Sequence, residues 1–342
     1  MYNMKHLWFE KGAYASKKAR LYQANEFEPN KVKNIAVIRH AALGDQVITR
    51  AFLIEARKFF PNAKITLCAV SNYQYAMPSD LVDNVHIMPG RQSGSKITQL
   101  EKIRKARELG EQDIIFDLAA TNRSYWLLAL TKAKLKIGFP YRPTVAKLLY
   151  DIAIFRSDLT PEIESMLHML KLLGHTPTYP LDFGYPDNRY LRESEKPFIV
   201  YFGGASQERK MYPFDKLTSL INLAAEKLPN YQHVYLEGIS ESEKADKLGE
   251  LTSDNINVQP SMDLDDVIAL IAKASVVVST DTGIRNVAIS THTPTVGIFY
   301  ATVPFRYTPT YEKHYITMNS NADIPSPEAI LDSICQATSD ID

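Results

Sequence analysis

Short apolar segments alternate with amphipathic segments along most of the chain, beginning near residue 34. In the N-terminal half, this pattern predicts strands at residues 34–39, 64–70, 84–88, 113–117 and 135–138. Helices are expected at residues 45–60, 97–110, 124–131 and 162–173. Regular alternation of strands and helices is typical of an α/β fold, in which helices cover both faces of a parallel sheet.

The alternation is interrupted at residues 175–197, where four prolines indicate a linker. It then resumes, with strands expected at residues 198–202, 233–237, 275–279 and 295–299. Helices are expected at residues 213–228, 240–251, 264–272, 284–290 and 326–335. We therefore expect two doubly wound domains, residues 1–180 and 190–342, that face a central cleft.

Two segments have the pattern of an anion-binding turn, because each combines an apolar strand, a glycine and the start of a helix. The first is Arg39-His40-Ala41-Ala42-Leu43-Gly44-Asp45, and the second is Thr280-Asp281-Thr282-Gly283-Ile284-Arg285-Asn286. Such a turn points backbone N–H groups and the positive end of a helix dipole at an anion. One turn in each expected domain favours an enzyme that handles a nucleotide-linked substrate.

Asp45 is the first candidate for chemistry, and its position allows two interpretations. An aspartate at the start of a helix commonly caps the free backbone N–H groups of the first turn. Alternatively, the carboxylate is a general base that activates a hydroxyl nucleophile, and the helix dipole favours the ionised form that this role requires.

Composition and charge narrow the function classes. The chain has 342 residues and equal numbers of basic and acidic residues, 39 of each, so its net charge gives no argument for nucleic-acid binding. Basic residues are in excess at residues 1–33 and 91–107. Either stretch is a solvated helix face or a surface for an acidic substrate or anionic lipid. We find no P-loop motif and no metal-ligand spacing of histidines in the sequence.

The two cysteines have no metal or redox spacing, and Cys68 lies in an apolar run that predicts burial. This usage fits a reducing compartment. The sequence has neither a signal-peptide pattern nor an apolar run of membrane-spanning length. We expect a cytoplasmic protein with, at most, peripheral contact with the inner membrane.

Six segments in a fixed order resemble glycosyltransferase family 9, the bacterial lipopolysaccharide heptosyltransferases. Each motif is weak by itself, but their order and spacing agree with the family from about residue 33 to 335. The matching segments are Val37–Asp45, Phe60–Ile65, Asp117–Ser124, Lys136–Phe139, Gly203–Ser206 with Lys210–Pro213, and Asp281–Gly283.

The resemblance implies a GT-B architecture in which the N-terminal domain binds the sugar acceptor and the C-terminal domain binds a nucleotide-sugar, ADP-heptose in most members. It implies an inverting, metal-independent transfer to a lipopolysaccharide core or similar acidic glycan, with no cofactor. Asp45 matches the proposed base of the family. The positions that match donor-binding residues are Ser206, Lys210, Glu241 or Glu243, Met262, Asp281, Thr282 and Gly283.

Each of these positions also has a simpler interpretation. Lys210 could be an exposed lysine at a helix start, although a cation there is unfavourable to the helix dipole. Thr282 and Gly283 could form an ordinary turn, and Met262 could be a core residue. Glu241 and Glu243 could both lie on a solvated helix start.

The chain departs from the family pattern in three places. Asn286 stands where the family has histidine, and Arg285 beside it is expected to restore a cation near the leaving group. Tyr212 replaces tryptophan, and Ala119-Ala120 replaces Gln-Gly in the acceptor domain. Arg123 and the basic stretch, including Arg104 and Lys105, are expected to face an anionic acceptor.

Two other function classes stay open from the sequence. A nucleotide-sugar epimerase shares the two-domain fold but needs no acceptor site, so product analysis with and without acceptor separates the two enzymes. A degenerate family member would only bind a glycan or a partner. It would show no difference in turnover between the wild type and Asp45→Ala.

Overall fold

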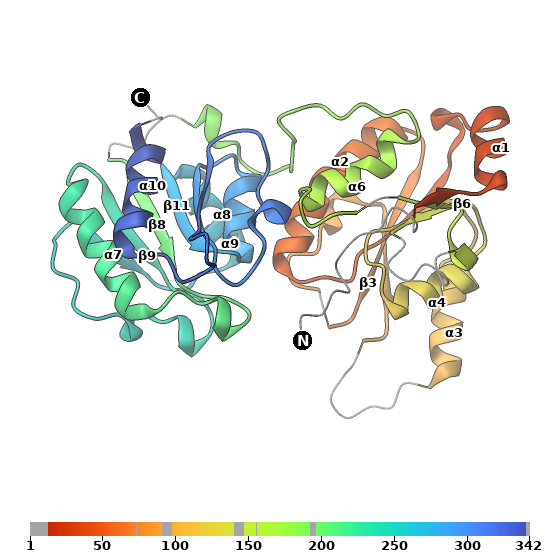
Figure 1. Ribbon diagram of the computed structural model, residues 1–342. Helices are drawn as coiled ribbons and strands as arrows, with labels where there is room; N and C mark the ends of the chain where they lie inside the picture. The colour runs from red at the N-terminus through yellow and green to blue at the C-terminus, as the bar shows by residue number, and fades with distance from the viewer. Residues whose placement is uncertain are drawn as a thin grey trace. The chain divides into compact units, whose positions relative to one another are not determined.

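The computed structural model describes residues 13–72, 74–90, 98–139, 147–154, 156–191 and 196–339. The chain divides into two compact units, Met1–Asp182 and Phe183–Asp342 (Figure 1). Each unit is a predominantly parallel sheet with helices on both faces, as the alternating pattern predicted. Among the described helices, none combines the length and apolar character needed to cross a membrane.

The N-terminal unit contains a seven-stranded sheet in the order β1-β7-β6-β5-β2-β3-β4. The strands are β1 (Tyr14–Ala15), β2 (Asn34–Ile38), β3 (Lys64–Val70), β4 (Asn84–Met88), β5 (Gln112–Asp117), β6 (Ala133–Gly138) and β7 (Ile152–Ala153). Only the edge strand β1 is antiparallel to its neighbour among these described strands. The sequence did not predict β1 and β7, because two residues are too few to show a period.

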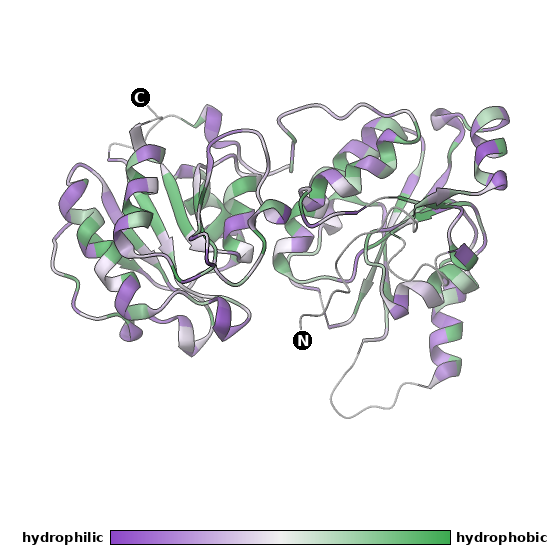
Figure 2. Cartoon of the chain, in the orientation of Figure 1, coloured by the Kyte–Doolittle hydropathy of each residue, from purple (hydrophilic) through white to green (hydrophobic). Residues whose placement is uncertain are grey.

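Helices cover both faces of this sheet. They are α1 (Lys17–Asn25), α2 (Leu43–Phe59), α3 (Gln99–Glu108), α4 (Asn122–Leu130) and α6 (Glu162–Lys171). On one face, Phe52 of α2 packs edge-on against Phe116 of β5 with ring centroids 5.3 Å apart. On the other, α3 and α4 share an apolar cluster with Ile115 and with Cys68, whose predicted burial is confirmed. Figure 2 shows the apolar strands between helices with polar outer surfaces.

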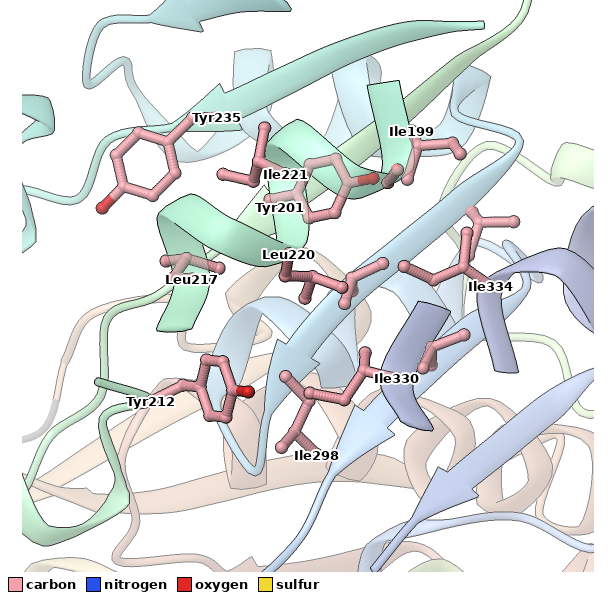
Figure 3. Packing of buried hydrophobic residues seen from close by; sticks show 14 of the residues in the cluster. Ile199, Tyr201, Tyr212, Leu217, Leu220, Ile221, Tyr235, Ile298, Ile330 and Ile334 are labelled. Carbon is pink, nitrogen blue, oxygen red and sulfur yellow. The ribbon is translucent and has the colours of Figure 1, made fainter. Parts of the chain in front are cut away.

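The C-terminal unit contains a six-stranded parallel sheet in the order β10-β9-β8-β11-β12-β13. The strands are β8 (Phe198–Phe202), β9 (Gln232–Leu236), β10 (Ile256–Gln259), β11 (Val276–Thr280), β12 (Thr295–Ile298) and β13 (His314–Thr317). Helices α7 (Phe214–Lys227) and α10 (Pro327–Ser339) pack on one face, where Leu220 and Ile330 meet Ile298 (Figure 3). Helices α8 (Leu264–Lys273) and α9 (Gly283–Ser290) contact each other.

The helix expected at residues 240–251 is absent. The structure has two short 3-10 helices instead, Glu241–Glu243 and Ala245–Lys247. The Glu237 carboxylate accepts a hydrogen bond from the Ala245 N–H at 2.8 Å, and the Glu243 carboxylate accepts one from Ser240 N–H at 3.1 Å. These side chains satisfy backbone donors locally, so a continuous helix loses its advantage.

The two glycines of the expected anion-binding turns are also placed differently from the prediction. Gly44 is the second residue of α2 and Gly283 is the first residue of α9, so both are helical. The chain turns before them, and neither glycine has the positive φ that would require glycine. Their small size, and not their conformational freedom, remains available for close approach of a ligand.

Candidate active site

The carboxyl ends of the parallel strands carry the residues that the sequence singled out. Ligands of open α/β sheets bind outside this edge of the sheet, because the loops there precede the N-termini of the crossing helices. In the N-terminal unit, the segments after β2 and β5 bring His40, Asp45, Thr121 and Arg123 to this edge. In the C-terminal unit, the segments after β8 and β11 bring Lys210 and Asp281 together.

Asp45 lies in the first turn of α2 and is held by an arginine. Its Oδ1 atom accepts a hydrogen bond from Arg39 Nη2 at 2.9 Å, and its side chain is 32% exposed. The N-cap residue of α2 is Ala42, which has no capping side chain. Asp45 therefore does not occupy the N-cap position, and its carboxylate is partly open to solvent while one oxygen is fixed.

The arginine that holds Asp45 is itself buried and fixed from two other directions. Arg39 Nη1 donates to the Leu118 carbonyl oxygen at 2.7 Å and lies 3.4 Å from Glu162 Oε1. Arg156 Nη2 donates to both oxygens of the Glu162 carboxylate at 2.8 Å. Arg39 belongs to the motif, but the sequence indicates no role for it. Glu162 and Arg156 are far away in the chain, so no local pattern connects them with Asp45.

His40 is held between two cations. Its Nδ1 lies 3.0 Å from Thr121 Oγ1, and its buried Nε2 has no hydrogen-bond partner within the described residues. Burial, with the neighbouring Arg123 and Arg39 charges, lowers the pKa of His40 to about 3. The imidazole is therefore neutral at physiological pH, and the positive charge at this edge belongs to the arginines.

Arg123 is the cation of this edge that has no acidic partner among the described residues, whereas Arg104 and Lys105 lie near an acid on α3. Arg123 is half-buried in the first turn of α4 and has no side-chain partner in the described part of the chain. On α3, Glu108 lies 2.6 Å from Lys105 and 3.8 Å from Arg104. Arg91 and Lys96, also of the basic stretch, lie outside the described residues.

In the C-terminal unit, a short ion pair joins two motifs that are 71 residues apart. Lys210 Nζ donates to Asp281 Oδ2 at 2.8 Å, and the two side chains are 17% and 8% exposed. Strands β8 and β11 are neighbours in the sheet, so the segments that follow them reach the same place. The ion pair therefore brings two of the residues that the sequence singled out into direct contact.

Two threonine hydroxyls lie beside this ion pair without partners. Thr282 is the N-cap residue of α9, but its side chain does not cap the helix. Its Oγ1 atom and that of Thr280 are buried and make no hydrogen bond to any described residue. A buried hydroxyl without a partner costs stability, so both hydroxyls are available to bind a ligand or a water molecule.

The remaining candidates of this edge differ in burial. Glu243 packs so closely against the backbone of Gly204 and Gly238 that neither glycine has room for a Cβ atom. Glu241 is exposed, as is Ser206 in the segment after β8, and Met262 is half-buried after β10. Of the two glutamates between which the sequence could not choose, Glu243 is the one built into the loops at the strand ends.

Arg285 has a different environment from the one expected. Its side chain is buried, and its guanidinium donates to the Tyr307 carbonyl oxygen at 2.9 Å and to Thr308 Oγ1 at 3.0 Å. Burial lowers the pKa of Arg285 to about 10, against the opposing effect of Asp281. Arg285 was expected to lie beside the leaving group, but its guanidinium instead holds the segment at residues 304–308. The neighbouring Asn286 is also buried.

Comparisons with known proteins identify the family of this chain. Residues 103–329 match the model of glycosyltransferase family 9 (heptosyltransferase). Lipopolysaccharide heptosyltransferase 1 of Campylobacter coli is 21% identical over an alignment of 299 residues that covers 80% of this chain and 85% of the relative. These matches extend over both units.

Solved structures show the same fold. A glycosyl transferase of family 9 from Veillonella parvula has a TM-score of 0.73 at 18% identity, covering 92% of this chain and 99% of its own. The E. coli heptosyltransferase WaaC with ADP-2-deoxy-2-fluoro heptose has a TM-score of 0.69 at 18% identity, covering 90% and 100%. A UDP-N-acetylglucosamine 2-epimerase from Listeria monocytogenes reaches 0.55 at 13% identity, covering 90% and 88%. The predicted fold class, GT-B, is confirmed.

Proposed function

The chain belongs to glycosyltransferase family 9, and we propose that it moves a heptose or a related sugar from a nucleotide diphosphate to an acidic glycan. ADP-heptose is the proposed donor, because a solved structure of the same fold, WaaC, contains ADP-2-deoxy-2-fluoro heptose. The proposed acceptor is a lipopolysaccharide core or a glycan of similar charge, since the curated relative is a lipopolysaccharide heptosyltransferase.

The observation that carries this proposal is the held carboxylate of Asp45. A sugar hydroxyl is a poor nucleophile, so it needs a base within hydrogen-bond reach. Arg39 occupies Oδ1, and we assign the second oxygen, Oδ2, to the acceptor hydroxyl. Asp45 takes the proton while the hydroxyl oxygen attacks the anomeric carbon and the bond to the diphosphate breaks. Attack opposite to the leaving group inverts the anomeric centre.

Lys210 and the start of α9 are the proposed holders of the departing diphosphate. A diphosphate accumulates negative charge as it leaves, and positioned cations and N–H donors stabilise that charge. Lys210 would turn from Asp281 to a phosphate oxygen, while the Thr282 hydroxyl and the Gly283 N–H donate to the same group. Ser206 is placed to add a further hydroxyl from the segment after β8. In this scheme the transfer needs no metal.

The nucleoside and the acceptor would occupy the flanks of these two edges. Glu243 is the proposed partner of the ribose, in preference to Glu241, because only Glu243 is built into the loops after β8 and β9. Met262 would pack against the base. On the acceptor side, Arg123 is the proposed contact for an acidic group, with a weaker contribution from Arg104 and Lys105.

Product analysis with and without acceptor tests the proposal. The protein is incubated with ADP-heptose alone and with a deacylated lipopolysaccharide core, and released ADP and sugar products are separated. ADP release that requires the acceptor, together with a glycosylated core, is the expected result. Conversion of the donor sugar without acceptor would indicate an epimerase, and no turnover of any nucleotide-sugar would indicate a binding protein.

A further inference from the structure

A lysine-lined pocket lies in the N-terminal unit at the edge opposite to Asp45. Its volume is about 850 Å³. Its lining includes two carboxylates and a larger number of cations, which are Lys18, Arg107, Lys132, Lys134, Lys136 and Lys147. The pocket surrounds the amino end of β6, whereas Asp45 follows the carboxyl end of β2, and β6, β5 and β2 run in the same direction.

The spacing of lysines along β6 explains why they gather there. Residues 132, 134 and 136 are two apart, so their side chains leave the same face of the strand. Lys18 comes from the start of α1, where its Nζ donates to the Ala133 carbonyl oxygen at 3.3 Å. Figure 1 shows α1, α4 and β6 at the same end of this unit.

Some of these cations are already compensated within the fold. Lys18 lies 3.1 Å from Asp151, and Lys134 lies 2.7 Å from Asp113. The Lys136 ammonium donates to the Leu128 carbonyl oxygen at 2.6 Å. Burial and the Lys18 charge lower the pKa of Lys136, against the opposing effect of Asp151. The hydrogen bond to Asp113 instead raises the pKa of Lys134.

The other cations have no acidic partner in the described ranges. Arg107, Lys132 and Lys147 are exposed, and none of their side chains makes an ion pair or hydrogen bond to a described residue. Next to Lys147, the apolar side chain of Leu148 also lines the pocket and is 81% exposed. The cations would attract an anion. The exposed leucine beside them would instead be buried by an apolar surface.

We propose that this pocket docks the protein on a membrane by binding the phosphate of an anionic phospholipid headgroup. Cations matched to the phosphate and a leucine matched to the acyl boundary are the two features that a lipid surface presents together. A free phosphate ion would account for the lysines but not for Leu148.

Vesicle sedimentation of the full chain tests the proposal. We expect binding to phosphatidylcholine–phosphatidylglycerol vesicles, weaker binding to pure phosphatidylcholine, and loss of binding in high salt. Each basic residue near an anionic surface contributes about fivefold, so Lys132→Gln with Lys147→Gln should lower the partition coefficient by roughly 30-fold. Leu148→Ser should lower it further, although the charge is unchanged.

The matched control is Lys227→Gln with Lys273→Gln, which removes the same charge from exposed positions in the C-terminal unit. Its vesicle binding should stay within about twofold of the wild type. An equal loss in the control, equal binding to neutral vesicles, or competition by inorganic phosphate with no effect of Leu148→Ser would overturn the proposal. The assay contains no donor or acceptor, so its outcome is independent of the proposed glycosyl transfer.

Discussion

An ion pair lies at the carboxyl edge of each sheet, and the two pairs have opposite polarity. In the N-terminal unit, Arg39 is 5% exposed and its partner Asp45 is 32% exposed. In the C-terminal unit, Asp281 is 8% exposed and its partner Lys210 is 17% exposed. The more buried partner is therefore the cation in one pair and the acid in the other, so the more accessible group is a carboxylate in the first pair and an ammonium in the second.

The difference shows how one architecture supports two chemistries. A buried cation that is fixed from three sides presents an acid, which suits proton abstraction from a hydroxyl. A buried acid presents a cation, which suits a diphosphate. The fold-level likeness of the two units does not decide this, because the polarity depends on single residues at the strand ends.

The largest expected effect is on the exposed acid. Asp45→Asn keeps a hydrogen-bond acceptor for Arg39 but removes the base, so kcat should fall by roughly 10²–10⁴-fold. ADP affinity, measured by calorimetry, should not change. Asp80→Asn, which alters an exposed aspartate paired with Arg50, is the matched control. Turnover of Asp45→Asn within about threefold of the wild type would remove Asp45 as the base.

In the ion pair of the C-terminal unit, Lys210→Ala removes the more accessible partner. A hydrogen bond to a charged group is worth about 1.5–3 kcal/mol, so ADP should bind roughly 10–100-fold more weakly. Adenosine, which has no phosphate, should lose much less affinity. Lys216→Ala, on the same unit, serves as the control. Equal losses for ADP and adenosine would place Lys210 away from the phosphates and break the comparison between the two pairs.

The neutral His40 beside Arg39 predicts a pH effect on stability. Its pKa of about 3 in the folded protein lies below the unfolded value of about 6.5. The unfolded chain therefore binds more protons between these values, and stability falls as pH falls through that window. His40→Asn keeps a partner for Thr121 but does not titrate.

Urea unfolding at neutral pH and at about pH 4.5 measures this effect. The wild type should lose about 2–3 kcal/mol more than His40→Asn between the two conditions, because about pH 4.5 lies two units below the unfolded pKa and each unit is worth about 1.4 kcal/mol. Equal losses of unfolding free energy in both proteins would mean that the pKa of His40 is not lowered in the folded protein. The His40 imidazole would then accept a proton next to Arg39 and Arg123 without loss of stability.

The positioning of Asp45 by Arg39 is tested with a variant that keeps the positive charge. Arg39→Lys cannot bridge the Leu118 carbonyl, Glu162 and Asp45 at once, because a lysine lacks the planar fork of an arginine. We expect kcat to fall by roughly tenfold with little change in the KM for the donor. The reason is that a displaced base slows proton transfer but does not affect donor binding. A loss of stability with unchanged kcat would make Arg39 a structural residue only.

The sequence predicted most strands of both sheets, but it could not predict the partners of the site residues. Residues 64–70, 84–88 and 198–202 are strands with the predicted bounds. The strands at 64–70 and 198–202 are mostly buried and have apolar runs, as buried parallel strands do. The segment 240–251 failed because Glu237 and Glu243 bind backbone donors, and this depends on tertiary position.

The sequence motifs pointed to the carboxyl edges of the two sheets. Which partner of each ion pair is the more buried depends on contacts in three dimensions. The Arg39–Glu162 pair joins residues 123 positions apart, and no local pattern connects them. Arg285 shows the same limit, since its neighbour Asn286 suggested a role at the ligand while its guanidinium reaches Tyr307 and Thr308. A buried arginine at a strand end can be noticed in a sequence, but its partners cannot.

The smallest expected effect concerns the exposed helix α3. Arg104 and Lys105 share Glu108, and the Arg104 side chain is 75% exposed, so solvent and salt screen their charges. Arg104→Ala with Lys105→Ala should raise the acceptor KM by about twofold at low salt and leave donor affinity unchanged. Steady-state kinetics at low and physiological salt measure this, with Arg123→Ala as the comparison that should have the larger effect. If the double variant weakens donor binding, or if acceptor kinetics at low salt do not change, α3 is a solvated face with no part in acceptor recognition.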